Sequence, residues 1–86
     1  MKQIKAKIVE KKADIYRFRY LNYYDGRKVL CRVFFDDADM PFRADLAIHR
    51  GQSISYFEKD LEKAKICCEK YLHNLFPSQD VNIAYC

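Results

Sequence analysis

Hydrophobic and polar residues alternate along much of the first half of the chain. In residues 3–10 the side chains of Ile4, Ala6 and Ile8 point one way and those of Lys5, Lys7 and Val9 the other. A similar pattern, rich in β-branched and aromatic residues, occupies residues 14–23 and 28–35 and returns at residues 42–49. A period of two places successive side chains on opposite faces of a strand. The sequence therefore predicts four strands, with a short helix as the alternative for residues 42–49.

An Asp-Gly dipeptide at residues 25–26 separates the second and third predicted strands. This dipeptide is the strongest short signal for a hairpin with a two-residue turn. Such a turn puts Tyr24 opposite Arg27 and fixes the register of the hairpin. One face then carries the pairs Tyr20–Cys31, Phe18–Val33 and Tyr16–Phe35, and the other carries Leu21–Leu30, Arg19–Arg32 and Arg17–Phe34.

The predicted register places two like charges, Arg19 and Arg32, directly opposite each other. Like charges in this position destabilise a sheet. The pair is tolerable in water, and it becomes useful where an anion or an acidic partner binds. The two arginines are therefore the strongest functional hint in the hairpin.

One helical pattern lies in the second half of the chain, after a break that the acidic residues and proline of positions 36–41 produce. Ser55 and Glu58 match a capping box, which predicts that the helix starts there. Apolar residues then recur at spacings of three and four: Phe57, Leu61, Ala64, Cys68, Leu72 and Leu75. Pro77 ends the helix near residue 75 or 76. Residues 81–85 alternate again and predict a fifth, terminal strand.

These elements predict a single compact α+β domain over residues 1–86, in two layers and in the order ββββαβ. An antiparallel sheet of four to five strands, built as a β-meander, carries one long amphipathic helix on one face. The predicted register offers the helix one apolar sheet face: Ile4, Ile8, Tyr16, Phe18, Tyr20, Cys31, Val33 and Phe35.

The composition suits a small intracellular domain. The chain has 86 residues, of which 50% are hydrophobic, and a net charge of +4, which permits acidic partners without requiring them. It contains neither a signal-peptide pattern nor a stretch that could span a membrane, so we expect a cytoplasmic protein that does not bind membranes. The four cysteines are then expected to be reduced thiols.

The sheet face away from the helix is the predicted binding surface. Alternation gives it basic residues mixed with apolar ones, and Tyr23 and Tyr24 beside the turn could stack on an unpaired base. The candidate binding residues are Lys5, Lys7, Arg17, Arg19, Arg32, Arg43, Tyr23, Tyr24, Leu30 and Phe34. A solvated face with no partner, and burial of the same face in a homodimer, are the alternatives that composition leaves open.

Catalytic and metal-binding signals are weak. The acids Asp36, Asp37 and Asp39 lack the spacing of a calcium loop, and His49 and His73 have no evident nucleophile or orienting acid beside them. Neither cysteine nor histidine spacing matches a zinc site. We therefore expect a protein without enzymatic activity, cofactor or metal; a hydrolase using His49 with the acidic loop is the last-ranked hypothesis.

The sequence thus predicts a small binding module that engages an acidic partner, either nucleic acid or a nucleoprotein complex, through a basic and partly apolar sheet face. The alternative is a protein inhibitor or adaptor, of the kind that phages encode, that blocks a larger host complex by protein–protein contact.

Overall fold

A computed structural model describes residues 1–13, 16–35, 41–46 and 54–86, except for the side chains of residues 13, 16 and 17. Its elements, in chain order, are β1 (Lys2–Ala13), β2 (Tyr16–Asp25), β3 (Lys28–Phe35), β4 (Phe42–Leu46), β5 (Ile54–Glu58), α1 (Leu61–Leu75) and β6 (Val81–Tyr85). The strand prediction for residues 42–49 is confirmed for Phe42–Leu46, and the rest of that range lies outside the described residues.

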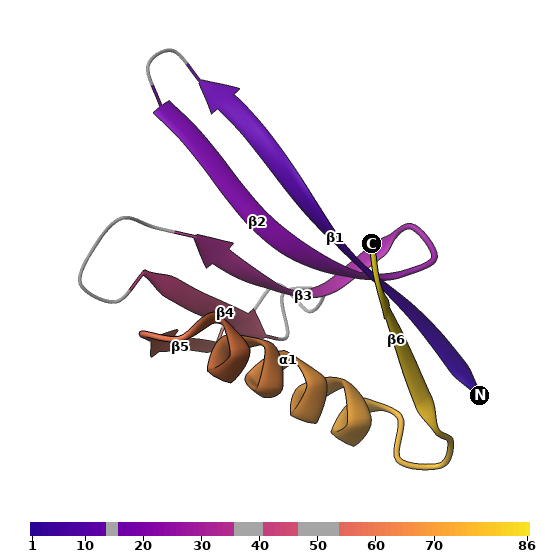
Figure 1. The fold of residues 1–86 in the computed structure, drawn as a ribbon. Coiled ribbons are helices and arrows are strands. Elements are labelled where there is room, and N and C mark those ends of the chain that lie inside the picture. Colours follow the sequence, from indigo (N-terminus) through magenta and orange to yellow (C-terminus); the bar gives the residue numbers. More distant parts are fainter. Residues whose placement is uncertain (14–15, 36–40, 47–53) are drawn as a thin grey trace.

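The strands form one six-stranded sheet in the order β5-β4-β3-β2-β1-β6. β1 to β5 pair antiparallel as a meander, whereas β6 pairs parallel with β1. The predicted α+β class is confirmed, with one helix among the described residues, but the expectation of a purely antiparallel sheet with four to five strands is wrong. Because α1 carries the chain back across the sheet, the strand that follows it runs in the same direction as β1 (Figure 1).

The helix begins later than predicted. Its N-cap is Asp60, whose Oδ1 accepts a hydrogen bond from the backbone N–H of Glu62 at 3.0 Å. Ser55 and Glu58 lie in β5, so the capping-box prediction is wrong; the β-branched and aromatic residues of this segment favour a strand instead. The inward stripe is confirmed for the residues that α1 buries: Ala64, Cys68 and Leu72.

The core lies between α1 and one face of the sheet (Figure 1). The sheet supplies these buried side chains to the core: Ile4, Ala6, Leu21, Tyr23, Leu30, Cys31, Val33, Ala44 and Leu46. The β1–β2 ribbon extends beyond this region and curves away from the helix (Figure 1). Ile8, predicted to face the helix, is therefore 52% exposed.

The register of the β2–β3 hairpin differs from the predicted one. The turn lies one residue later, with Asp25 opposite Lys28, and a register shift between Tyr23 and Tyr24 leaves Leu30 as an extra residue in β3. The two changes move β3 by three positions relative to β2. An odd shift exchanges the faces of one strand relative to the other.

Arg19 and Arg32 are therefore not a pair, and the sequence prediction is wrong on this point. Arg19 lies opposite Phe35 on the helix side of the sheet, whereas Arg32 lies opposite Asn22 on the other side. The same shift exchanges part of the predicted core: Leu21 and Tyr23 are buried toward the helix, and Phe18 and Tyr20 point away from it.

Candidate binding face

The sheet face away from α1, called the distal face below, consists of two rows of side chains that cross the strands. Residues directly opposite each other in an antiparallel pair point to the same face. The polar row is Lys7, Asn22, Arg32, Asp45 and Ser55. The aromatic row is Val9, Tyr20, Phe34, Arg43 and Phe57. Lys5 and Tyr24 flank the polar row, and Lys11 and Phe18 flank the aromatic row.

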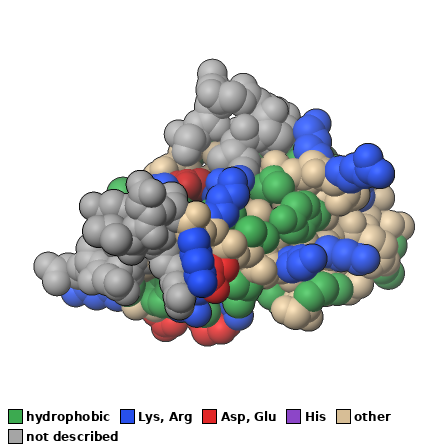
Figure 2. Space-filling view, turned by 90° about the horizontal axis from the view of Figure 1, so that it is seen from above, with side chains coloured by type: hydrophobic (Ala, Val, Ile, Leu, Met, Phe, Trp, Pro, Cys, Tyr) green, Lys and Arg blue, Asp and Glu red, His purple; other side chains and the backbone are tan. Residues whose placement is uncertain are grey.

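Basic residues predominate on this face. Its described acidic residue is Asp45, against the bases Lys5, Lys7, Lys11, Arg32 and Arg43. Figure 2 views the molecule from the side away from α1 and shows Lys and Arg side chains around and between a group of hydrophobic side chains. The face is thus cationic and apolar at once, and its members differ in part from the candidate residues.

Aromatic rings and guanidinium groups form layers at the centre of the distal face. The Tyr20 and Phe34 rings stack with their centroids 5.9 Å apart. Arg32 lies over the Tyr20 ring at 4.9 Å from its centroid, and Arg43 lies over the Phe34 ring at the same distance. A guanidinium over an aromatic ring is attracted to the negative ring face. The rings therefore hold both guanidinium groups in place on the surface.

The two arginines differ in charge compensation. Arg43 makes a two-point contact with Asp45, from Nε to Oδ1 at 2.9 Å and from Nη2 to Oδ2 at 3.2 Å. Ser55 Oγ also donates to Asp45 Oδ1, at 2.8 Å. This carboxylate is mostly buried and its hydrogen-bonding capacity is largely used. Arg43 is therefore neutralised within the sheet, whereas Arg32 has no ion pair with a described carboxylate.

Six of the ten predicted binding residues lie together on the distal face: Lys5, Lys7, Tyr24, Arg32, Phe34 and Arg43. Of the other four, Arg19 is on the helix side over the Phe35 ring, and the side chain of Arg17 is outside the described part. Tyr23 and Leu30 are buried at 0% and 3% exposure. Neither of these two can present its ring or side chain to a partner without unfolding.

Sequence reasoning missed several members of the distal face. Phe18 and Tyr20 were assigned to the core, Ser55 and Phe57 to the helix, and Asn22 to no site. The membership of Phe18, Tyr20 and Asn22 follows from the extra residue in β3, for which the turn sequence gave no signal. The start of α1 at Leu61 and not at Ser55 is what places Ser55 and Phe57 in an edge strand.

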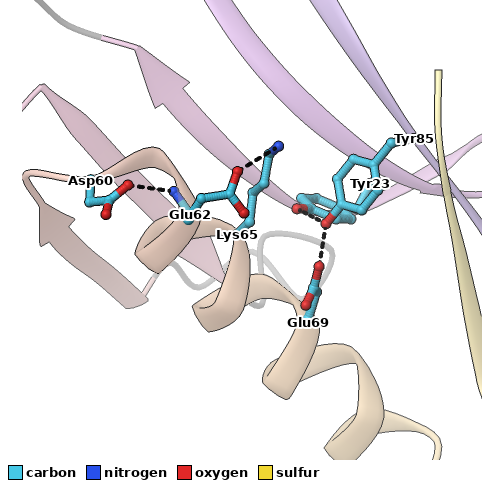
Figure 3. Close-up of polar contacts among 6 residues, drawn as sticks. All are labelled: Tyr23, Asp60, Glu62, Lys65, Glu69 and Tyr85. Carbon is cyan, nitrogen blue, oxygen red and sulfur yellow. Dashed lines mark hydrogen bonds and ion pairs between the residues drawn. The ribbon is translucent and has the colours of Figure 1, made fainter.

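A separate polar network joins α1, β2 and β6 on the opposite face (Figure 3). Tyr85 donates its hydroxyl hydrogen to Glu69 Oε1 at 2.6 Å, and the Tyr23 and Tyr85 hydroxyl groups lie 2.8 Å apart. Because Tyr85 gives its hydrogen to the carboxylate, Tyr23 is the donor in the second bond. Burial raises the pKa of Tyr23 far above its usual range, and burial together with the bond to Glu69 raises the pKa of Tyr85. The two tyrosine hydroxyl groups therefore stay neutral, and their hydrogen bonds hold β6 against the core.

Two of the four cysteines, Cys31 and Cys68, are core side chains. Cys31 and Cys68 are buried beside each other, and the contact between the thiols, together with burial, raises the pKa of Cys68. Cys67 donates to Glu58 Oε1 at 3.8 Å, and burial and this carboxylate raise its pKa. Cys86 is exposed. Within the described ranges no three His, Cys, Asp or Glu side chains converge as metal ligands.

The acidic loop Asp36, Asp37 and Asp39 and the histidine His49 lie outside the described residues, so the last-ranked hydrolase hypothesis stays a prediction. In the part of the chain that the structure covers, no helix has the length and apolar character needed to cross a membrane. No protein-family model matches the chain, and no curated protein or solved structure matches it either.

Proposed function

We propose that the protein is a non-enzymatic binding module for single-stranded nucleic acid and that the distal face is its binding surface. The observation that carries the proposal is the aromatic row beside the polar row, with a guanidinium lying over each of two rings. Proteins that bind single strands combine a basic surface for the phosphates with planar groups on which bases stack. The distal face offers both kinds of group.

Planar groups for stacking are accessible at different places on the face. Phe57, in the edge strand β5, is 58% exposed, and Phe18 at the far side is 38% exposed. Tyr20 is buried beneath Arg32, so the surface above it is the guanidinium plane. Guanidinium planes stack on bases as aromatic rings do. A single-stranded nucleic acid that crosses the sheet would therefore meet a series of flat groups.

Phosphate contacts fall to the cations that the sheet does not neutralise. Lys5 and Lys7 are exposed, and neither has an ion pair among the described residues. Arg32, in the middle of the polar row, has no ion pair with a carboxylate among the described residues. Arg43, by contrast, is bound to Asp45, so we assign it a positioning role over Phe34. Binding through phosphates releases counterions and weakens as salt rises.

The chain provides a matched pair of variants to test the proposal. Arg19 and Arg32 each lie over an aromatic ring, at 5.4 and 4.9 Å, but on opposite faces of the sheet. Binding of a fluorescent oligothymidine would be measured for Arg32→Ala and Arg19→Ala between 50 and about 300 mM salt. We expect R32A to lose about tenfold in affinity and to flatten the log–log salt dependence by about 0.7, the value for one phosphate contact of a single strand.

R19A is expected to bind as the wild type does, because its guanidinium is on the helix side. Equal losses in the two variants would mean that net charge alone attracts the oligonucleotide and would contradict a binding face. No binding by the wild-type protein would also contradict the proposal. In that case the alternative, an inhibitor or adaptor that contacts a protein, predicts a stoichiometric complex that survives nuclease treatment.

A second candidate function is self-association through β5, which the exposed apolar side chains of this strand favour. Ile54, Tyr56 and Phe57 are 53%, 49% and 58% exposed at the edge of the described sheet. Edge strands with free main-chain groups are templates for pairing. A homodimer of this kind predicts a doubled mass in light scattering that Tyr56→Lys returns to the monomer value. A monomeric mass for the wild type at about 200 μM would exclude it.

A further inference from the structure

A basic pocket lies at the turn end of the distal face. It has a volume of about 420 Å³ and is lined by Lys5, Lys7, Tyr24, Gly26, Arg27 and Cys86. The lining comes from three separate segments of the chain: β1, the β2–β3 turn and the residue after β6. The volume falls in the range of small-ligand sites, which run from about 300 to 1,000 Å³.

The side chains that line this pocket carry an excess of positive charge. Three of its lining residues, Lys5, Lys7 and Arg27, are cations, and no acidic side chain lines it. The acid closest in sequence, Asp25, is held by Lys2 in an ion pair of 2.8 Å. None of the three cations has an ion pair with a described carboxylate. Three lining cations without an ion pair to a described carboxylate favour an anion of high charge.

The turn leaves room for a ligand to approach the backbone. Gly26 has φ of +62°, and a Cβ built on it would meet nothing within 4 Å. Tyr24 forms another part of the wall, and its hydroxyl accepts a hydrogen bond from Asn22 Nδ2 at 3.1 Å. The Tyr24 hydroxyl hydrogen is therefore free to be donated to a ligand oxygen. The pocket combines three cations, a hydroxyl donor and an unhindered backbone segment.

We propose that this pocket binds the terminal phosphate monoester of a nucleic-acid strand that lies on the distal face; the inference rests on the proposed function. A terminal phosphate carries nearly two negative charges near pH 7, whereas a phosphodiester within a strand carries one. The pocket lies at the β1 end of the polar row, where Lys7 belongs to both, and adds Lys5 and Arg27 toward the turn. A nucleic-acid strand that follows the rows toward β1 would thus place its end, and its most highly charged group, in the pocket.

Two neighbouring residues in the turn region allow a matched test. Arg27 lines the pocket, whereas Lys28, next to it and exposed, does not. Affinities of 5′-phosphorylated, 3′-phosphorylated and unphosphorylated oligothymidine of one length would be compared for the wild type, Arg27→Gln and Lys28→Gln. We expect one of the two terminal phosphates to raise wild-type affinity about three- to tenfold. R27Q should lose this advantage and K28Q should keep it.

Cys86 gives a readout of where the phosphate sits. Cys31 and Cys68 are buried, so in a Cys67→Ser background Cys86 is the accessible cysteine. A bound terminal phosphate should slow its modification by a thiol reagent about three- to tenfold more than the unphosphorylated strand does, in parallel with the affinity gain.

The outcomes separate the two proposals. If all three oligonucleotides bind equally well to the wild type, the pocket has no preference for a terminal phosphate; this inference fails and the proposed function stands. An advantage that survives in R27Q, with Cys86 still reactive, would place the phosphate elsewhere and would also overturn the inference. If no oligonucleotide binds, the proposed function fails, and this inference fails with it.

Discussion

Asn22 and Arg32 lie directly opposite each other in the β2–β3 ladder, and each has a buried polar atom without a hydrogen-bond partner among the described residues. The two atoms are complementary, because Arg32 Nε is a donor and Asn22 Oδ1 is an acceptor. Asn22 is 5% exposed, and Arg32 lies over the Tyr20 ring. Buried polar groups without partners are uncommon, and they mark a place where a small rearrangement or a ligand can add a bond.

The shape of Arg32, and not its charge alone, should therefore matter for binding. Arg32→Lys keeps the charge but replaces a planar guanidinium by an ammonium group, which cannot lie flat over Tyr20. We expect R32K to weaken oligonucleotide binding about two- to fivefold, because an ammonium group cannot stack on a base as the guanidinium plane does. Arg19→Lys, on the other face, is the control and should bind normally. Wild-type affinity in R32K would show that charge alone is used.

Removing either hydroxyl group of the Tyr23–Tyr85 hydrogen bond should lower the free energy of unfolding, but by unequal amounts. Tyr85→Phe leaves the donor of Tyr23 buried without an acceptor, since Tyr23 is 0% exposed. Tyr23→Phe instead removes a donor from Tyr85, which is 44% exposed and can turn to water. We expect Y85F to lower the free energy of unfolding by about 1–3 kcal/mol and Y23F by about 0.5–1.5 kcal/mol. Urea unfolding measures both, and a larger loss in Y23F would contradict this assignment of donors.

Alkaline pH should destabilise the fold through the same tyrosines. The pKa of Tyr23 is raised in the folded state, chiefly by burial, above the unfolded value of about 10. The contribution of Tyr23 to the free energy of unfolding is fully present below the unfolded-state pKa. It is lost as the pH rises through the folded-state pKa, because the unfolded chain then binds fewer protons than the native one. One such group costs at most about 1.4 kcal/mol per pH unit in that window.

Denaturant unfolding of the wild type and Y23F at pH 8 and pH 10.5 tests this linkage. The stability advantage of the wild type over Y23F should shrink at the higher pH, because Y23F has no hydroxyl to ionise at this position. A constant difference between the two proteins would show that Tyr23 ionises normally in the folded state.

The thiols should react in an order set by burial. Cys86 is exposed and should react first with a disulfide reagent near pH 8. Cys67 is half-buried, and its pKa is raised by burial and by Glu58, so it should follow slowly. Cys31 and Cys68 are buried and should react only when the protein unfolds. Reaction of all four in one fast phase under native conditions would contradict the described packing.

The β2–β3 turn should depend on the backbone of Gly26. Its φ of +62° lies in the left-handed region, while the space around it is open. Gly26→Ala is thus expected to lower stability through backbone strain, by about 1–2 kcal/mol, without a steric clash. Asn tolerates this conformation, so Gly26→Asn is the control and should lose less. A neutral G26A in urea unfolding would indicate that the turn can change its conformation freely.

Hydrophobic periodicity was enough to locate most strands and the residues that α1 buries. Alternation in β1 and the spacing of Ala64, Cys68 and Leu72 are properties of single elements. The spacing of apolar residues along the sequence is therefore enough to predict them. The excess of basic residues over acidic ones was also visible in advance, as was the presence of cations on an open sheet face.

Tertiary structure decided how the elements combine. The extra residue at Leu30 is stabilised by burial in the core, a contact remote from the turn, and it alone exchanges the faces of Arg19 and Arg32. The parallel pairing of β6 depends on the path of α1 across the sheet, and the pairing of β4 with β5 joins Asp45 to Ser55. A strand pattern states which side chains share a face within one strand. The register between adjacent strands decides which of these faces lie on the same side of the sheet, and core packing selects that register.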